Sequence, residues 1–143
     1  EATYLVPAGS AIQTVAEVDR NGVRIGVYGR SAYGLWLADN IQCAERVITD
    51  SVDASFELFV EQGLEVLAGL RPRLVADAAK LPGARILDGQ FTAVQQAIGC
   101  KPERTSGAQF LHDFIEEAKD SGLVADLLEK HGVMGRLTVA PPA

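Results

Sequence analysis

Short apolar runs alternate with amphipathic stretches along the first two thirds of the chain. Runs rich in β-branched or other apolar residues predict strands at 3–6, 23–27, 45–49, 65–70 and 85–87. Between them, apolar residues recur at helical spacing and predict helices at 12–18, 32–40, 51–61 and 71–80. This alternation predicts an α/β fold, with a mostly parallel sheet flanked by helices.

The last third of the chain has a different pattern. A further strand is predicted at 91–98, and helices are predicted at 108–121 and 123–130. Between the strand and the helices lies the polar stretch Cys100–Gly107 (CKPERTSG). It shows neither the alternation typical of a strand nor the apolar spacing typical of a helix, and it is typical of a joint between two parts of a chain. We therefore expect an α/β lobe over residues 1–99 and a C-terminal helical pair with its tail over residues 100–143.

The stretch from Val23 to Leu37 predicts a strand, a tight polar turn and a helix whose N-cap is Ser31. Such a unit places unpaired helix N–H groups beside the carboxyl end of a strand, where an anionic ligand group can bind. Arg30 adds a positive charge. The alternative is an ordinary helix cap beside a solvated arginine. The candidate ligand-binding residues at this turn are Tyr28, Arg30, Ser31, Ala32 and Tyr33.

Two further candidates lie later in the chain. Arg71 follows the carboxyl end of a predicted central strand, which is where open α/β sheets bind ligands, although it is equally compatible with a surface charge at a helix start. Gln95 and Gln96 lie in the predicted strand at 91–98. Since side chains alternate along a strand, only one of the two is expected to face a ligand, and Gln95 is the candidate.

Composition narrows the classes of function. The chain has 143 residues, enough for one domain with a real core, and a net charge of −6, which argues against nucleic acid as a partner. No stretch approaches the about 20 apolar residues of a membrane span. Its two cysteines, Cys43 and Cys100, are too few and too far apart for a zinc site, and we expect two buried thiols, with a disulfide as the alternative.

Catalysis, metals and cofactors are not expected from the residues present. His112 and His131 both lie in the predicted C-terminal helices, far in sequence from either cysteine, and are expected at the surface or at a helix end. No nucleophile–base set or acid pair is evident. The sequence begins without an initiator Met or a signal peptide, so we expect a processed or trimmed product.

The order of several motifs resembles the type 2 periplasmic solute-binding proteins, and more narrowly the amino-acid-binding family 3 of ABC importers. These motifs are Ser10–Thr14 with Val18-Asp19, the strand–turn–helix around Ser31, Gly63–Pro72 (GLEVLAGLRP), and Leu127–Gly132 (LLEKHG). The resemblance implies two α/β lobes joined by crossing strands, here Tyr4–Val6 and Thr92–Ile98. It also implies that the main body of the first lobe, which would precede Glu1, is absent.

The same resemblance bears on the ligand. The family often has Gly-x-x-Asp-Ala-x-x-x-Asp in the 63–70 segment, and its last Asp receives the α-amino group of the solute. Here Glu65 and Leu70 stand at the two acidic positions. An apolar side chain at position 70 cannot bind an ammonium group, so a simple α-amino acid is not the expected ligand.

For function, the resemblance implies binding of a small polar or anionic solute without catalysis, in the periplasm, with the membrane subunits of an ABC importer as partners. Because the final helices would lack their usual partner, we expect them to be covered by folding back or by a second copy in a homo-oligomer. The alternatives are the effector-sensing domain of a LysR-type regulator, a dehydratase of the cyclohexadienyl kind, and an oligomeric scaffold that no longer binds solute.

Overall fold

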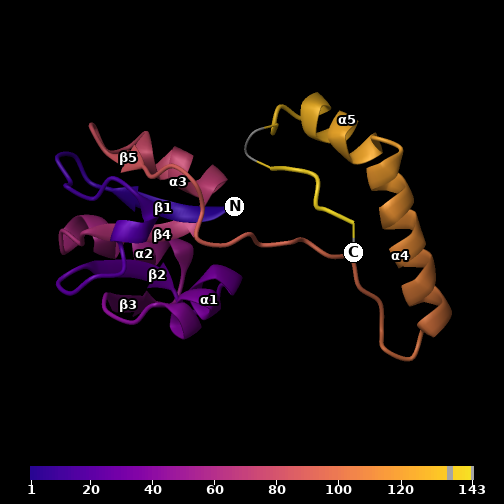
Figure 1. The fold of residues 1–143 in the computed structure, drawn as a ribbon, viewed down its shortest axis with the longest axis horizontal. Coiled ribbons are helices and arrows are strands. Elements are labelled where there is room, and N and C mark those ends of the chain that lie inside the picture. The colour runs from indigo at the N-terminus through magenta and orange to yellow at the C-terminus, as the bar shows by residue number, and fades with distance from the viewer. Residues whose placement is uncertain (135–136, 143) are drawn as a thin grey trace. The chain divides into compact units, whose positions relative to one another are not determined.

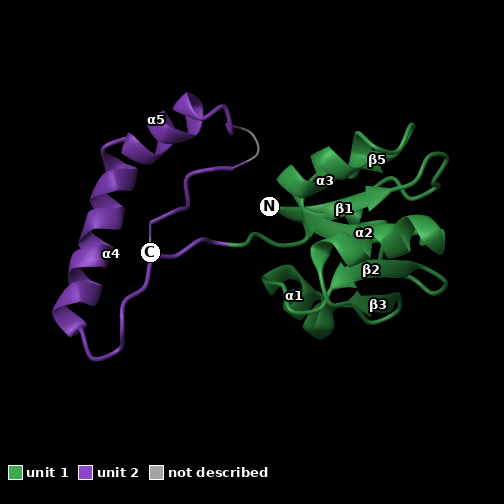
Figure 2. Cartoon of the chain, turned by 180° about the vertical axis from the view of Figure 1, so that it is seen from behind, with its two compact units in different colours: residues 1–94 green, residues 95–143 purple. Residues whose placement is uncertain are grey.

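The computed structural model describes residues 1–134 and 137–142, and its chain divides into two compact units, Glu1–Val94 and Gln95–Ala143 (Figure 2). The division falls at the start of an extended segment and precedes the Cys100–Gly107 stretch. The first unit carries the sheet, and the second carries two helices.

The first unit is built on one five-stranded sheet (Figure 1). Its strands lie in the order β3 (Glu45–Thr49), β2 (Arg24–Tyr28), β4 (Val66–Leu70), β1 (Ala2–Val6) and β5 (Arg85–Ile86). β2 pairs in parallel with β3 and β4, whereas β1 pairs antiparallel with β4 and β5. The predicted α/β fold with a helix-flanked sheet is confirmed, and the sheet is mixed because β1 alone runs the opposite way.

Helices follow the three parallel strands almost without a linker. α1 (Ala32–Asn40), α2 (Val52–Glu61) and α3 (Arg71–Ala78) begin within four residues of the strands before them. Ser31 and Ser51 cap α1 and α2, each accepting a hydrogen bond from the third amide of its helix. Pro72 lies in the first turn of α3, where its missing N–H costs nothing. The helix predicted at 12–18 is only a short 3₁₀ turn, η1 (Val15–Glu17).

Two apolar clusters pack on opposite faces of the sheet. The larger contains Tyr4, Val6, Ile25, Val27, Tyr33, Leu37 and Val66, and the smaller contains Leu5, Phe59, Leu64, Leu67 and Leu74. α1 thus covers one face, while α2 and α3 cover the other. Successive residues of β1 and β4 enter different clusters, so both strands are buried on both sides, as predicted for the 65–70 run.

Two predictions about the first unit are wrong. The predicted strand at 91–98 is reduced to a single bridge between Thr92 and Ala2. The apolar face predicted from helical spacing over residues 32–40 consists of Ala32, Tyr33, Leu35, Trp36 and Ala38. Of these only Tyr33 is buried, so the buried face of α1 is rotated from the predicted one. Leu35 is 60% exposed and Trp36 is only half-buried, packing at 5.3 Å on Phe91, while Tyr33 and Leu37 are the buried residues.

The second unit contains α4 (Thr105–Asp120) and α5 (Leu123–Lys130), which contact each other and are separated by Gly122, whose positive φ of 82° ends the first helix. α4 begins three residues before the predicted start. No helix in the described ranges is long and apolar enough to cross a membrane. The expected burial of the thiols is wrong, because both Cys43 and Cys100 lie in exposed loop segments as free cysteines.

Candidate functional site

The carboxyl ends of β2, β3 and β4 share one edge of the sheet because these strands are parallel. α1, α2 and α3 all begin at this edge, which we call the carboxyl edge and define as residues 28–33, 49–53 and 70–73. The start of the antiparallel strand β1 lies there too, since Ala2 pairs with Leu70 (Figure 1). Three helix N-termini thus direct their positive ends to one edge of the sheet.

The start of α1 leaves two backbone amides available. The Ser31 hydroxyl donates to the Tyr28 carbonyl at 2.7 Å and accepts from the Gly34 amide at 2.9 Å, and the Leu35 amide donates to the Ser31 carbonyl at 2.9 Å. Among the described residues, the amides of Ala32 and Tyr33 have no acceptor. These two N–H groups can therefore bind an anionic group.

Two glycines allow the turn to lie this close to the sheet. A Cβ on Gly34 would overlap the Tyr28 carbonyl oxygen and lie 2.9 Å from the Ser31 hydroxyl. A Cβ on Gly29 would lie 2.5 Å from Cγ2 of Ile48 on β3. The strand end, the cap and the helix start are consequently held as one tight unit.

Three arginines lie at the carboxyl edge, and two of them have acidic partners. Arg71 donates from Nε to the Glu1 carboxylate at 2.7 Å and from Nη2 to the Gly89 carbonyl at 2.6 Å. Arg73 pairs with Asp53 at 2.7 Å and with the buried Asp77 at 2.8 Å. Arg30 is exposed and forms no ion pair with any described residue. Arg30 is therefore the cation at this edge that is available to a ligand.

Aromatic and apolar groups lie beside the α1 start. Tyr33 is 5% exposed, and burial raises the pKa of its phenol, although a hydrogen bond with Ser31 and the charge of Arg73 lower it in part. The phenol is therefore neutral at pH 7 and keeps its hydrogen. Tyr28 is half-buried at the end of β2, and Leu70 is half-buried at the end of β4, packed against the larger cluster.

The structure brings Tyr28, Arg30, Ser31, Ala32, Tyr33, Leu70 and Arg71 to the same edge of the sheet, as their order along the strands implies. Gln95 belongs to the second unit, where it is exposed and lines a cavity of about 710 Å³ between residues 95–102, α4 and residues 140–142. The role of Gln95 stays a prediction. Gln96 is exposed as well, so the expected alternation of the two glutamines is absent.

Sequence reasoning missed Arg73. Its side chain joins the start of α2, through Asp53, to α3, through Asp77, and so fixes two of the three helix starts at the carboxyl edge. The i, i+4 spacing of Arg73 and Asp77 was a visible signal for the second contact. The contact with Asp53 depends on how two helices pack and has no local signal. No group of three metal-ligating side chains occurs within residues 1–134 and 137–142.

Comparison with protein-family models found no match, and comparison with curated proteins found none. Solved structures do match. A P235GK mutant of ArgBP from T. maritima is 20% identical with a TM-score of 0.66, and the alignment covers 90% of this chain and 56% of that one. An ancestral arginine-binding protein bound to arginine is 16% identical with a TM-score of 0.65, covering 90% and 58%. A putative binding component of an ABC transporter from Wolinella succinogenes, complexed with lysine, is 15% identical with a TM-score of 0.65, covering 90% and 57%.

This chain has the fold of ABC-transporter binding proteins. The predicted resemblance is confirmed at the level of fold, and the chain spans little more than half the length of the structures it matches. An ancestral cyclohexadienyl dehydratase shares the fold as well, with 18% identity and a TM-score of 0.56 over 90% of this chain and 55% of that one. The fold is thus compatible with both binding and catalysis.

Proposed function

We propose that this chain is a solute-binding module of an ABC importer, and that it holds the carboxylate of a small solute at its carboxyl edge without catalysing a reaction. The observation that carries the proposal is the start of α1, where the available amides of Ala32 and Tyr33 adjoin the unpaired Arg30. A carboxylate there gains charge-assisted hydrogen bonds from a guanidinium and from a helix N-terminus.

The neighbouring residues have distinct roles in this proposal. Ser31 positions the amides by capping α1, and Tyr28 supplies a half-buried aromatic side chain with a hydroxyl donor. Tyr33 contributes its backbone amide, because its side chain is buried. Arg71 fixes the start of β1 through its pair with Glu1, so it shapes the edge rather than gripping the solute. Leu70 gives the edge an apolar neighbour, and the solute's amino group, where it has one, finds no partner in that side chain.

The proposed partners and location of this chain rest on the proteins that share its fold. Similar structures include the substrate binding protein of an amino acid ABC transporter, a putative binding component of an ABC transporter complexed with lysine, and a periplasmic binding protein with glutathione bound. We propose that this chain works in the periplasm, delivers its solute to importer membrane subunits, and self-associates through α4 and α5. The LysR-type and scaffold alternatives gain no support from these structures, which are named as binding proteins or a dehydratase.

A ligand screen tests the proposal. The full chain is heated with a panel of small carboxylates, amino acids and amines, because a ligand that binds only the native state must raise the melting temperature. Each hit is then compared by calorimetric titration with its decarboxylated and its deaminated analogue. We expect the decarboxylated analogue to lose binding and the deaminated analogue to keep it. The reverse order would contradict a carboxylate grip at α1.

A pair of variants assigns the grip to Arg30. Arg30→Gln should weaken binding of the best carboxylate by about tenfold or more, since a charge-assisted pair is lost. Arg20→Gln is the matched control, because Arg20 is also exposed but lies with Val23 and Leu64 at the opposite edge of the sheet. Equal effects of the two substitutions would indicate a general charge effect and refute the assignment.

A further inference from the structure

The cavity of the second unit has one wall that is formed by the end of the chain. α4 provides its floor through the apolar side chains of Leu111 and Ile115, which are half-buried. Residues 95–102 form one wall, and residues 140–142 form another. The tail over residues 137–142 belongs to no helix or strand, so the hydrogen bonds of a regular element do not hold it in place.

Two hydrogen bonds hold the tail, one near each end. At its start the amide of Leu137 donates to the carbonyl of Val133 at 3.0 Å. At its far end the carbonyl of Pro141 accepts from the ammonium group of Lys119 on α4 at 2.9 Å. Residues 138–140, which lie between these contacts, form no hydrogen bond with any other described residue. The position of residues 140–142 against α4 therefore depends on Lys119.

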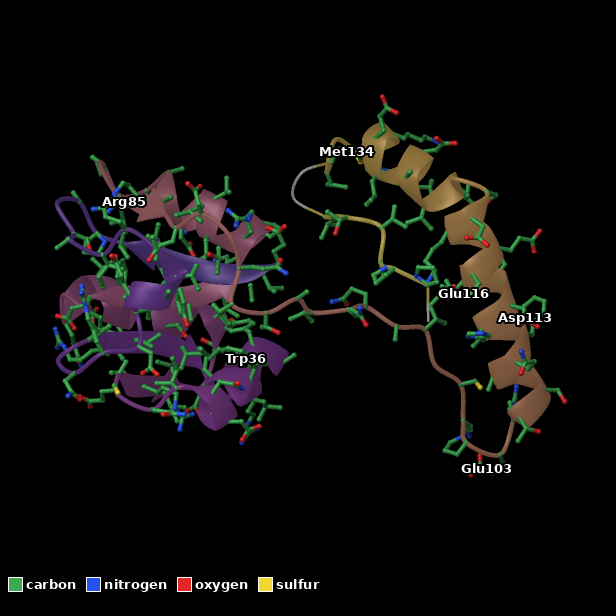
Figure 3. All side chains as sticks on the ribbon, in the orientation of Figure 1. Trp36, Arg85, Glu103, Asp113, Glu116 and Met134 are labelled. Atoms are coloured by element: carbon green, nitrogen blue, oxygen red, sulfur yellow. The ribbon has the colours of Figure 1, made fainter. Side chains whose placement is uncertain are left out.

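Lys119 is more buried than a lysine in a simple surface ion pair. It pairs with Glu116 at 2.6 Å, and its side chain is only 11% exposed. Lys80 pairs with Asp77 at the same spacing of three residues, yet its side chain is 56% exposed. Glu116 lines the cavity and lies on the side of α4 towards the tail, so it directs the ammonium group to that side (Figure 3). With little water to compete, the bond from Lys119 to Pro141 is strengthened.

The chemistry of the tail matches that of its partner. Proline has no backbone N–H, so Pro141 and Pro142 offer carbonyl acceptors and no donor. An ammonium group has three donors and no acceptor, and Lys119 directs two of them at Glu116 and Pro141. The proline rings also fix φ, so this end of the tail loses little conformational entropy when it is held extended. A preordered acceptor segment thus meets a largely buried donor.

We propose that residues 137–142 act as a strap that closes the cavity of the second unit, with Lys119 holding the end of the strap against α4. In the closed form the strap covers the apolar floor at Leu111 and Ile115. When the contact between Lys119 and Pro141 breaks, the cavity opens along residues 140–142 and the floor becomes accessible. Because one charge-assisted hydrogen bond holds this end, the strap is releasable, and it controls access to the cavity.

Backbone ¹⁵N relaxation of the full chain tests whether the strap is held. In the wild type, the heteronuclear NOE of residues 138–140 should approach that of α4, because it reports fast motion and the tail is held at both ends. Lys119→Met keeps the apolar stem but removes the charged donor, so these values should fall to those of a free chain end. Lys119→Arg should keep most of the wild-type values, since a guanidinium also donates to a carbonyl. Lys130→Met is the matched control, because Lys130 is exposed in the last turn of α5 and pairs with no described residue.

Binding of the dye anilinonaphthalene sulfonate tests whether the cavity opens. The dye also binds other exposed apolar side chains, so the wild-type fluorescence is the baseline. Lys119→Met should raise the fluorescence about twofold or more, because the floor at Leu111 and Ile115 becomes accessible. Lys130→Met removes the same charge and should leave the fluorescence at the baseline. Far-ultraviolet circular dichroism checks that the helices persist, and if Lys119→Met loses them, the wild-type relaxation values decide the matter.

Three results would overturn the proposal. One is a wild-type tail whose amides already move like a free chain end. Another is a Lys119→Met variant whose tail stays as ordered as that of Lys130→Met. The third is a tail that is released without any rise in dye fluorescence, which would refute its role in closing the cavity. None of these results bears on the carboxyl edge, which is tested separately through Arg30 and its ligand titrations.

Discussion

At the level of single residues, the start of α1 combines an available cation, two available amides and two glycines at which a Cβ would meet a neighbouring atom. Ser31 as the cap could be predicted from the sequence, because capping is a local property of a polar residue before a helical pattern. The difference between Arg30 and its neighbours Arg71 and Arg73 could not, because it depends on Glu1 and Asp53, which come from other parts of the chain.

Gly34 tests how tightly the α1 start is packed. Gly34→Ala should lower the free energy of unfolding by about 1–3 kcal/mol, since its Cβ would overlap the Tyr28 carbonyl oxygen and the strand end must shift. Gly99→Ala should change it by less than about 0.5 kcal/mol, because nothing lies within 4 Å of that Cβ. Urea unfolding measures both. Similar values for the two variants would mean that the turn is not close-packed.

The stability of the folded state depends on pH in part through Asp19. Its carboxylate accepts hydrogen bonds from the amides of Gln42, Cys43 and Ala44 at 2.7–3.2 Å, and these hold its pKa below the ordinary value for an aspartate. A lowered pKa in the folded state stabilises the protein above the unfolded-state pKa, and this stabilisation is lost as the pH falls through the folded-state pKa.

Asp19→Asn should therefore lower the melting temperature at pH 7, and its difference from the wild type should shrink as the solution is acidified below pH 4. Asp39→Asn is the control, because Asp39 is exposed on α1 and its carboxylate makes no hydrogen bond or ion pair within the described ranges. Melting curves between pH 3 and pH 7 decide the question. A difference that stays constant over this range would show that the carboxylate charge is not responsible.

At the level of elements, the strand–turn–helix units of the first unit were predictable because their signals are local. β3, α1 and α2 have the predicted bounds or begin directly after the predicted cap. The rotation of α1 was not predictable, since it is set by the contact of Gly34 with the end of β2. The reversed direction of β1 was not predictable either, since it depends on pairing with the distant β4.

Asp77 anchors the side chain of Arg73, which in turn joins α3 to Asp53 of α2. It is fully buried and pairs with Arg73 and with Lys80 at 3.1 Å. Asp77→Ala should lower the free energy of unfolding by about 2–4 kcal/mol, because it leaves Arg73 without its buried partner. Asp39→Ala, an exposed counterpart, should have an effect below about 0.5 kcal/mol. Chemical denaturation of the two variants measures the difference, and equal losses would contradict the anchoring role.

At the level of the whole molecule, the chain consists of a sheet-based unit and a helical unit joined by an extended segment. The two apolar clusters of the first unit are drawn entirely from residues 1–94. The sequence indicated a joint near Cys100–Gly107 from composition alone, whereas the division after Val94 follows from the contacts within each unit, which composition does not show.

Limited proteolysis should separate the two units. We expect the first cuts between residues 95 and 104, where the backbone is extended and its side chains are exposed, and we expect the fragment 1–94 to unfold cooperatively on its own. Mass spectrometry of the fragments and calorimetry of the larger one provide the measurement. A first cut inside the sheet, or a fragment without a cooperative transition, would contradict two separately packed units.

The account depends most on the claim that the α1 start grips a carboxylate. The most direct measurement is a titration of ¹⁵N-labelled chain with the best carboxylate from the screen, followed by the backbone amide resonances. The account predicts saturable shifts that are largest at Ala32 and Tyr33 and that disappear in Arg30→Gln. Saturable binding that leaves these two amides unmoved would contradict it.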